Sequence, residues 1–154
     1  VLTDLLKPGG LMRIGLYSDL ARKHIAKVRN EIVSDRVGTS EAEIRRFRQS
    51  LTESYDEDHQ LLTTSDDFFS LSMLRDLILH VQEHHFTLPQ IKNCLDELGL
   101  KFCGFENEIH TSNFRELHRN KSDSYDLELW HQYEERNPQA FAEMYQFWCQ
   151  KPAV

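Results

Sequence analysis

The chain has 154 residues, of which 40% are hydrophobic and 28% are charged, a balance that is typical of a folded globular domain. Its formal net charge of −7 disfavours a nucleic-acid partner, because a phosphate backbone repels an acidic surface. The sequence contains no apolar run of about 18 residues, the length that a membrane span requires. We therefore expect no membrane partner. Three cysteines without a CxxC pair fit reduced thiols, which predicts a cytoplasmic protein. The length predicts one domain, residues 1–154.

The chain opens on the end of a helix, a turn and a buried strand. The turn Lys7-Pro8-Gly9-Gly10 precedes the short apolar run 11–17, which predicts a strand inside a sheet. Ser18 is placed to cap a helix that runs to about Ser34, where apolar residues recur at helical spacing between basic ones. Such a unit normally follows the cofactor-binding part of an open parallel sheet, so we expect the back half of an α/β fold.

Helical patterns follow the first strand. A hydroxyl group at Thr39 or Ser40, with acidic residues after it, predicts the start of a helix that runs through about Leu51. The acidic and polar stretch 52–67 is expected to form a loosely packed helix or loop. The apolar pattern at 68–78 then predicts an amphipathic helix. Helices therefore outnumber strands in this half of the chain.

The second half contains two further predicted strands. Thr87 caps a helix that ends at Gly99, where glycine supplies the left-handed conformation, and a short strand at 101–106 follows directly. The remaining predicted elements are an irregular segment at 107–123, a helix at 125–135, a short helix starting at Asn137-Pro138 and a terminal strand at 144–150. The predicted fold class is α/β, with helices in excess.

Three stretches of the sequence carry a resemblance: LLKPGGLMRIGLYS, TLPQIKNCLDELGLKFCGFE and MYQFWCQKP. They resemble the second half of class I S-adenosylmethionine-dependent methyltransferases. The first is similar to the helix, turn and fifth strand of that family, the second to the next helix and sixth strand, and the third to the closing seventh strand. The resemblance implies the C-terminal portion of a Rossmann-like sheet, with about three strands in the order five, seven, six and the last one antiparallel.

The resemblance also implies the substrate-recognition half of an enzyme. Residues 19–86 would form a large helical insertion, or lid, over the substrate site. The glycine-rich loop and the acidic residue that hold the cofactor in the family are not in this sequence, so we expect weak or no binding of S-adenosylmethionine and no activity of the chain alone. Strand 11–17 would lack a neighbour on one edge, which predicts a homodimer through that edge. The methyl acceptor stays unknown.

The segment before the sixth-strand helix would face the cofactor's methyl group. His80 and Glu83 are candidate general bases for the proton that a nitrogen or oxygen nucleophile loses on methylation. We expect Arg75 and Asp76 to orient or bind the substrate, and His84 to bind it as well. A polar loop whose histidines bond to the backbone is the alternative.

Tyr17 and Ser18 stand at the carboxyl end of the first strand, where ligands bind in open α/β sheets, so they are candidate substrate-binding residues. A helix cap is the alternative for Ser18. The second functional hypothesis is a non-catalytic α/β interaction or regulatory module.

Residues 80–84 also spell HxxEH, the pattern of inverted zinc peptidases, so a zinc hydrolase is the third hypothesis.

Overall fold

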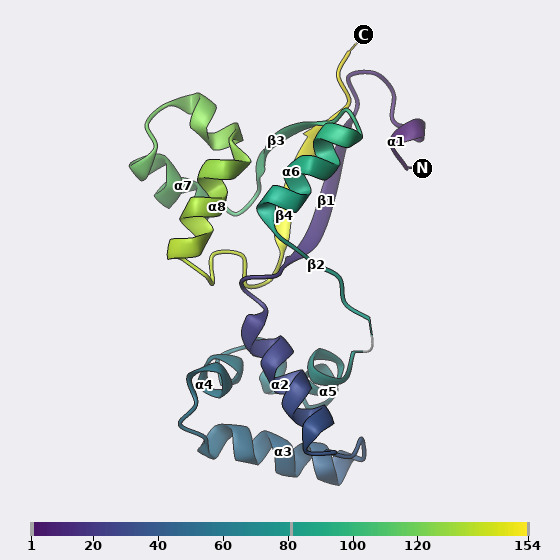
Figure 1. Ribbon diagram of the computed structural model, residues 1–154, viewed down its shortest axis with the longest axis vertical. Coiled ribbons are helices and arrows are strands. Elements are labelled where there is room, and N and C mark those ends of the chain that lie inside the picture. Colours follow the sequence, from purple (N-terminus) through teal and green to yellow (C-terminus); the bar gives the residue numbers. More distant parts are fainter. Residues whose placement is uncertain (1, 81, 154) are drawn as a thin grey trace. The chain divides into compact units, whose positions relative to one another are not determined.

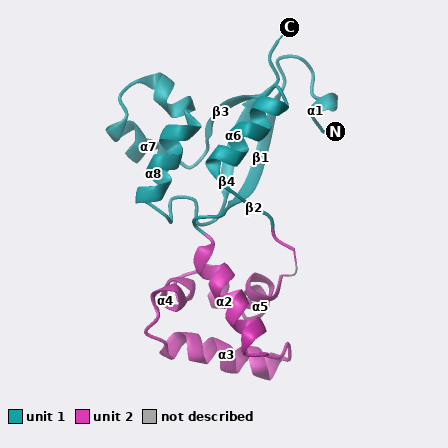
Figure 2. Ribbon diagram, in the orientation of Figure 1, with its two compact units in different colours: residues 1–21, 84–154 teal, residues 22–83 magenta. Residues whose placement is uncertain are grey.

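The computed structural model describes residues 2–80 and 82–153 (Figure 1). The chain divides into two compact units (Figure 2). Residues 1–21 and 84–154 form the sheet unit, and residues 22–83 form the helical unit. The helical unit falls inside the predicted insertion and has its own hydrophobic core. Neither described stretch contains a helix that is long and apolar enough to cross a bilayer.

The described part of the sheet unit contains four strands: β1 (Leu11–Ser18), β2 (His85–Phe86), β3 (Lys101–Phe105) and β4 (Tyr145–Gln150). Their spatial order is β2-β1-β4-β3, with β2 parallel to β1. β4 is antiparallel to both of its neighbours, β1 and β3. The predicted α/β class is therefore confirmed, as are the three main strands and the antiparallel direction of the last. The two-residue β2 is an additional strand.

The core of the sheet unit lies between the strands and three helices, α6 (Leu88–Glu97), α7 (Glu108–Leu117) and α8 (Leu127–Arg136). Side chains of β4 alternate between buried and more exposed positions, as a strand with one covered face requires. The buried residues of this core are Leu88, Ile91, Leu95, Leu100, Phe102, Phe114, Leu127, Trp130, Tyr133, Ala140, Phe141, Tyr145, Phe147 and Cys149.

Local capping chemistry explains the limits of α6. Thr87 Oγ1 accepts a hydrogen bond from Gln90 N, while Gln90 Oε1 accepts one from Thr87 N, so two free N–H groups of the first turn are satisfied. Pro89 lies in the same turn, where a missing N–H has no consequence. Gly99 has a φ of 62°, a conformation that a side chain would strain, and it turns the chain into β3. The predicted cap and stop of this helix are confirmed.

The described residues of the helical unit form α2 (Lys23–Ser34), α3 (Glu41–Glu53), α4 (Glu57–Thr63), the 3-10 helix η1 (Asp66–Phe68) and α5 (Leu71–Leu79). Ser40 caps α3 in a capping box with Glu43, which confirms the predicted start. The stretch that we expected to be a loosely packed helix or loop contains α4, whose Leu62 is fully buried. The core of the unit comprises Ile25, Val28, Ile32, Leu51, Leu62, Phe68, Leu74, Leu77 and Ile78.

The segment 107–123 is not irregular, contrary to the sequence prediction. It forms α7 and the start of a 3-10 helix, η2 (Lys121–Tyr125). The Asn107 side chain caps α7 by accepting a hydrogen bond from the backbone N–H three residues on. Phe114 is fully buried and stacks on Trp130, with ring centroids 3.9 Å apart. One buried ring thus anchors a largely polar helix, and hydrophobic periodicity gives too little weight to a single residue.

At two positions where the sequence predicts the start of a helix, the structure has a turn. The expected short helix at Asn137-Pro138 is a turn in which Ala140 N donates a hydrogen bond of 2.8 Å to Asn137 O. Ser18 does not cap α2, which begins at Lys23; its Oγ accepts a hydrogen bond of 3.0 Å from Ala21 N in the connecting turn. The error at Ser18 has a simple cause, because hydroxyl side chains that cap helices also close turns of the same local shape.

The open edge of β1 is shorter than the prediction supposes. α1 (Leu2–Leu5) and the Gly9 turn lead into β1, and β4 pairs with residues 11–16. On the other side, β2 pairs with Tyr17 and Ser18, and no described strand pairs with 11–16 there. The homodimer itself stays a prediction, now confined to residues 11–16 of that edge.

Candidate functional site

A buried carboxyl group lies at the carboxyl end of β1. Glu134, on α8, is only 1% exposed. Ser18 Oγ donates a hydrogen bond of 2.5 Å to Glu134 Oε1, and the Tyr145 hydroxyl contacts the two carboxyl oxygens at 2.7 and 2.8 Å. Burial raises the pKa of Glu134 above its ordinary value, because the charged form loses its contact with water. This cluster joins α8 to the ends of β1 and β4.

Helix and strand periodicity together assemble the Glu134 cluster. Trp130 and Glu134 are one helical turn apart and are both buried, so this glutamate belongs to the core-facing side of α8. Tyr145 begins the alternating inward positions of β4. The sequence analysis predicts a helix at 125–135 without singling out Glu134, and therefore misses it. The four-residue spacing from Trp130 is the pattern that could have found it.

A pocket of about 410 Å³ opens at the carboxyl end of β3 in the sheet unit. We call it the His110 pocket; its polar lining residues are Glu106, Asn107, His110, Gln139, Glu143 and Gln146. Because β1 and β3 are both antiparallel to β4, their carboxyl ends meet at the same edge of the sheet. Ligands of open α/β sheets bind at that edge, so the His110 pocket is the candidate site.

Hydrogen bonds hold the pocket in place. His110 Nδ1 lies 3.2 Å from the Tyr133 hydroxyl, on the neighbouring α8. Burial lowers the pKa of His110 below its ordinary value, so the imidazole is neutral at pH 7. Gln139 Nε2 donates a hydrogen bond of 3.3 Å to Ala21 O, which ties the pocket to the turn after β1. The sequence analysis does not identify His110, because its partners are far away along the chain.

The predicted residues at the end of β1 lie beside this edge. Ser18 is fully buried and bound to Glu134, so it holds the core together and is not exposed to a ligand. Tyr17 is half-buried and lies opposite His85 in the β1–β2 register. His84 immediately precedes β2 and is also in the sheet unit.

Three of the other predicted site residues come together in the helical unit. Arg75, Asp76 and His80 line an open pocket of about 660 Å³, together with Ser72 and Gln82. Arg75 and Asp76 lie on the exposed side of α5, and His80 is the residue that ends it. The predicted orienting residues and one predicted general base therefore line the same pocket.

Glu83 lies apart from that pocket, in a buried ion cluster. Its carboxylate pairs with Arg22, at 2.7 Å, and with Arg29, and the Glu83 side chain is 5% exposed. Arg29 also donates to Leu77 O at 2.9 and 2.6 Å, which fixes the end of α5 against α2. One carboxylate oxygen accepts a hydrogen bond from Arg29 and the other forms the ion pair with Arg22, so a role as general base would first require buried ion pairs to break. The arrangement favours a structural role for Glu83.

The HxxEH pattern does not form a zinc site of the predicted kind. That site needs both histidines on one continuous helix, one turn apart. Helix α5 ends at Leu79, His80 has extended backbone angles, and position 81 lies outside the described residues. Within residues 2–80 and 82–153, no group of three or more histidine, cysteine, aspartate or glutamate side chains is placed to hold a metal ion. The zinc-hydrolase hypothesis thus receives no support from the geometry.

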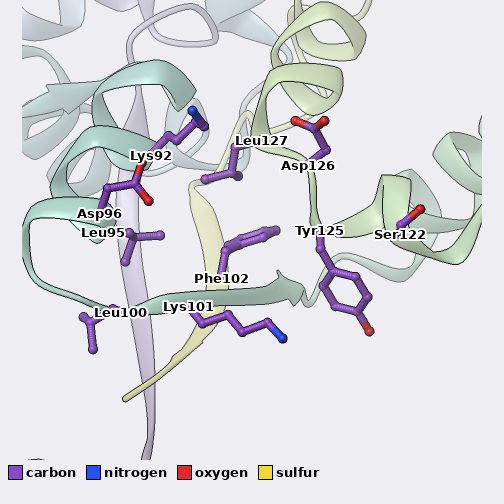
Figure 3. Close-up of a pocket in the computed structure, with 10 residues that line it drawn as sticks. All are labelled: Lys92, Leu95, Asp96, Leu100, Lys101, Phe102, Ser122, Tyr125, Asp126 and Leu127. Atoms are coloured by element: carbon purple, nitrogen blue, oxygen red, sulfur yellow. The ribbon is translucent and has the colours of Figure 1, made fainter. Parts of the chain in front are cut away.

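A second pocket of the sheet unit, also of about 410 Å³, lies at the opposite end of β3 (Figure 3). Its apolar side chains include Leu95, Phe102 and Leu127. Its charged residues are Lys92, Asp96, Lys101 and Asp126. Asp126 is engaged as the cap of α8, where its carboxylate accepts from Glu128 N at 2.9 Å. Two cations and two anions balance, so this pocket favours no ligand charge, and it lies at the amino end of β3.

Comparison with known proteins adds no identification: no family model matches the chain, and a search of curated proteins gives no match.

Proposed function

We propose that this chain is the substrate-side portion of a class I S-adenosylmethionine-dependent methyltransferase and is inactive without the cofactor-binding half. One observation carries the proposal. The last strand, β4, lies between β1 and β3 and is antiparallel to both. This is the order that the resemblance implies for the fifth, seventh and sixth strands, and it is unusual in parallel α/β sheets, which seldom insert an antiparallel strand between two parallel ones.

The His110 pocket supports the same reading, because it gives this portion a place for a methyl acceptor. The pocket lies at the carboxyl ends of the parallel strands β1 and β3, where open α/β sheets bind their ligands. Phe141 and Met144 are among its lining residues, so part of the wall is apolar.

The cofactor would supply the activated methyl group. That this chain alone binds S-adenosylmethionine weakly or not at all is part of the proposal, and we assign none of the described residues to the cofactor. What this portion contributes is the acceptor's position and the environment of its nucleophilic atom.

Calorimetry tests the proposal. The 154-residue chain and a polypeptide that extends upstream through a complete α/β half-fold are each titrated with S-adenosylmethionine. We expect saturable binding by the extended polypeptide and much weaker or no binding by the chain alone. Absence of binding by the extended polypeptide would contradict the proposal and favour a non-catalytic α/β interaction module.

A further inference from the structure

The His110 pocket has an electronegative lining. Neither lysine nor arginine is among its described lining residues. Arg13 Nε donates a hydrogen bond of 2.9 Å to Glu106, and the ion pair between them holds the pKa of that carboxyl below its ordinary value, so Glu106 is ionised and already paired. Glu143 is exposed at the pocket and belongs to no ion pair in the described chain. The pocket therefore offers one negative charge to a ligand.

Three residues that line the pocket carry acceptor groups and come from different segments. The Glu143 carboxylate is the first. Gln139 uses its Nε2 to bond Ala21 O, which leaves Oε1 as an acceptor. His110 uses Nδ1 to contact Tyr133, and its Nε2 has no partner among the residues that the structure describes. A primary ammonium group has three N–H donors, which matches this set in number and in charge.

The apolar part of the pocket defines the rest of the ligand. Phe141 and Met144 both line it, and Phe141 is also in ring contact with His110 at a centroid distance of 6.4 Å. An aromatic ring and a thioether pack against a hydrocarbon or aryl group without requiring hydrogen bonds. A ligand with a cationic nitrogen and a short apolar body satisfies both parts of the lining.

We propose that the His110 pocket binds a primary amine in its ammonium form, with His110 Nε2 accepting a hydrogen bond from it; that the amine is the methyl acceptor rests on the proposed function. Ammonium binding requires the tautomer in which Nδ1–H donates a hydrogen bond to the Tyr133 oxygen, because Nε2 then has a free lone pair.

Nuclear magnetic resonance on the 154-residue chain tests binding without any cofactor. Histidine ring resonances are followed at pH 7.5 during titration with 2-phenylethylamine. Two probes of matched size serve as controls, neutral 2-phenylethanol and anionic phenylacetate. We expect the amine to shift the His110 resonances saturably, and the other two to shift them far less. Before titration, the ring ¹⁵N shifts should show Nε2 without a proton.

Two substitutions locate the site. Glu143→Gln should weaken amine binding about two- to fivefold, the effect of removing one exposed ion pair. Glu135→Gln, at another exposed acid that does not line the pocket, should leave it unchanged. Equal shifts with phenylacetate, a protonated Nε2, or unchanged affinity in Glu143→Gln would each overturn the proposal.

The two proposals fail separately. If this chain binds the amine but the extended polypeptide does not bind S-adenosylmethionine, the methyltransferase proposal is refuted and the amine-site proposal is supported. Cofactor binding without amine binding would remove the amine site and keep the methyltransferase.

Discussion

Glu134→Ala removes the acceptor that two buried hydroxyl groups share. Ser18 and Tyr145 are both 0% exposed, so neither hydroxyl can turn to bulk water. A buried donor without a partner costs about 1–3 kcal/mol. The cavity that the missing side chain leaves adds to this, so we expect the free energy of unfolding to fall by about 3–5 kcal/mol.

Glu134→Gln is the matched change, because it keeps the size of the side chain and one carbonyl oxygen. That oxygen can accept from Ser18, and the new amide can donate to the Tyr145 oxygen. The substitution also removes a carboxyl group whose ionised form is disfavoured by burial. We expect the free energy of unfolding at neutral pH to stay within about 1 kcal/mol of the wild-type value.

The pH dependence separates charge from packing. A raised pKa means that the folded chain holds the Glu134 proton more tightly than the unfolded chain does. The stabilisation from this proton is complete below the unfolded value of 4.5 and is lost as the pH rises through the higher folded pKa. The glutamine variant has no such proton, so it should gain stability relative to wild type as the pH rises above 4.5.

Urea unfolding at pH 5 and pH 8, followed by tryptophan fluorescence, measures both effects, because Trp130 is buried in the same core. Glu135→Ala and Glu135→Gln are the controls, since this neighbour on α8 is 60% exposed. The reasoning is refuted if Glu134→Ala loses no more stability than Glu135→Ala. It is also refuted if the difference between wild type and Glu134→Gln is the same at the two pH values.

Three further predictions concern other parts of the chain. Glu83→Gln breaks two buried ion pairs and should lower the free energy of unfolding by about 3 kcal/mol in urea, whereas a loss near zero would contradict a structural role. Ser40→Ala removes the cap of α3 and should cost about 1 kcal/mol by the same measurement; an unchanged midpoint would show that the capping box contributes nothing. Light scattering after size-exclusion chromatography should give a dimer, and a clean monomer at high concentration would exclude pairing through residues 11–16 of the β1 edge.

Elements with strong local determinants were predictable from the sequence. The box at Thr87, the glycine at position 99 and the cap at Ser40 act within a few residues, so their effect depends little on the rest of the chain. The apolar runs of β1 and β4 are equally local, because strand side chains alternate wherever a strand forms.

The candidate site was not predictable in the same way. The sequence analysis proposed His80 and Glu83, which precede β2, as candidate general bases. The structure places Glu83 in a buried ion cluster instead. The sequence analysis missed His110, whose environment depends on Tyr133, 23 positions away along the chain. It also missed Glu134, whose partner Ser18 is 116 positions away. A titratable group acquires its chemistry from burial and neighbours, and neither follows from local spacing.

The sequence by itself determined the three main strands and the starts of α3 and α6, because caps, turns and hydrophobic periodicity act over one or two turns of chain. Only the tertiary structure decided that β4 lies between β1 and β3. It also decided that burial shifts the pKa values of Glu134 and His110. The reason is that strand pairing and burial depend on contacts between segments that are distant along the chain. Ser18 and Glu134, for example, are 116 positions apart.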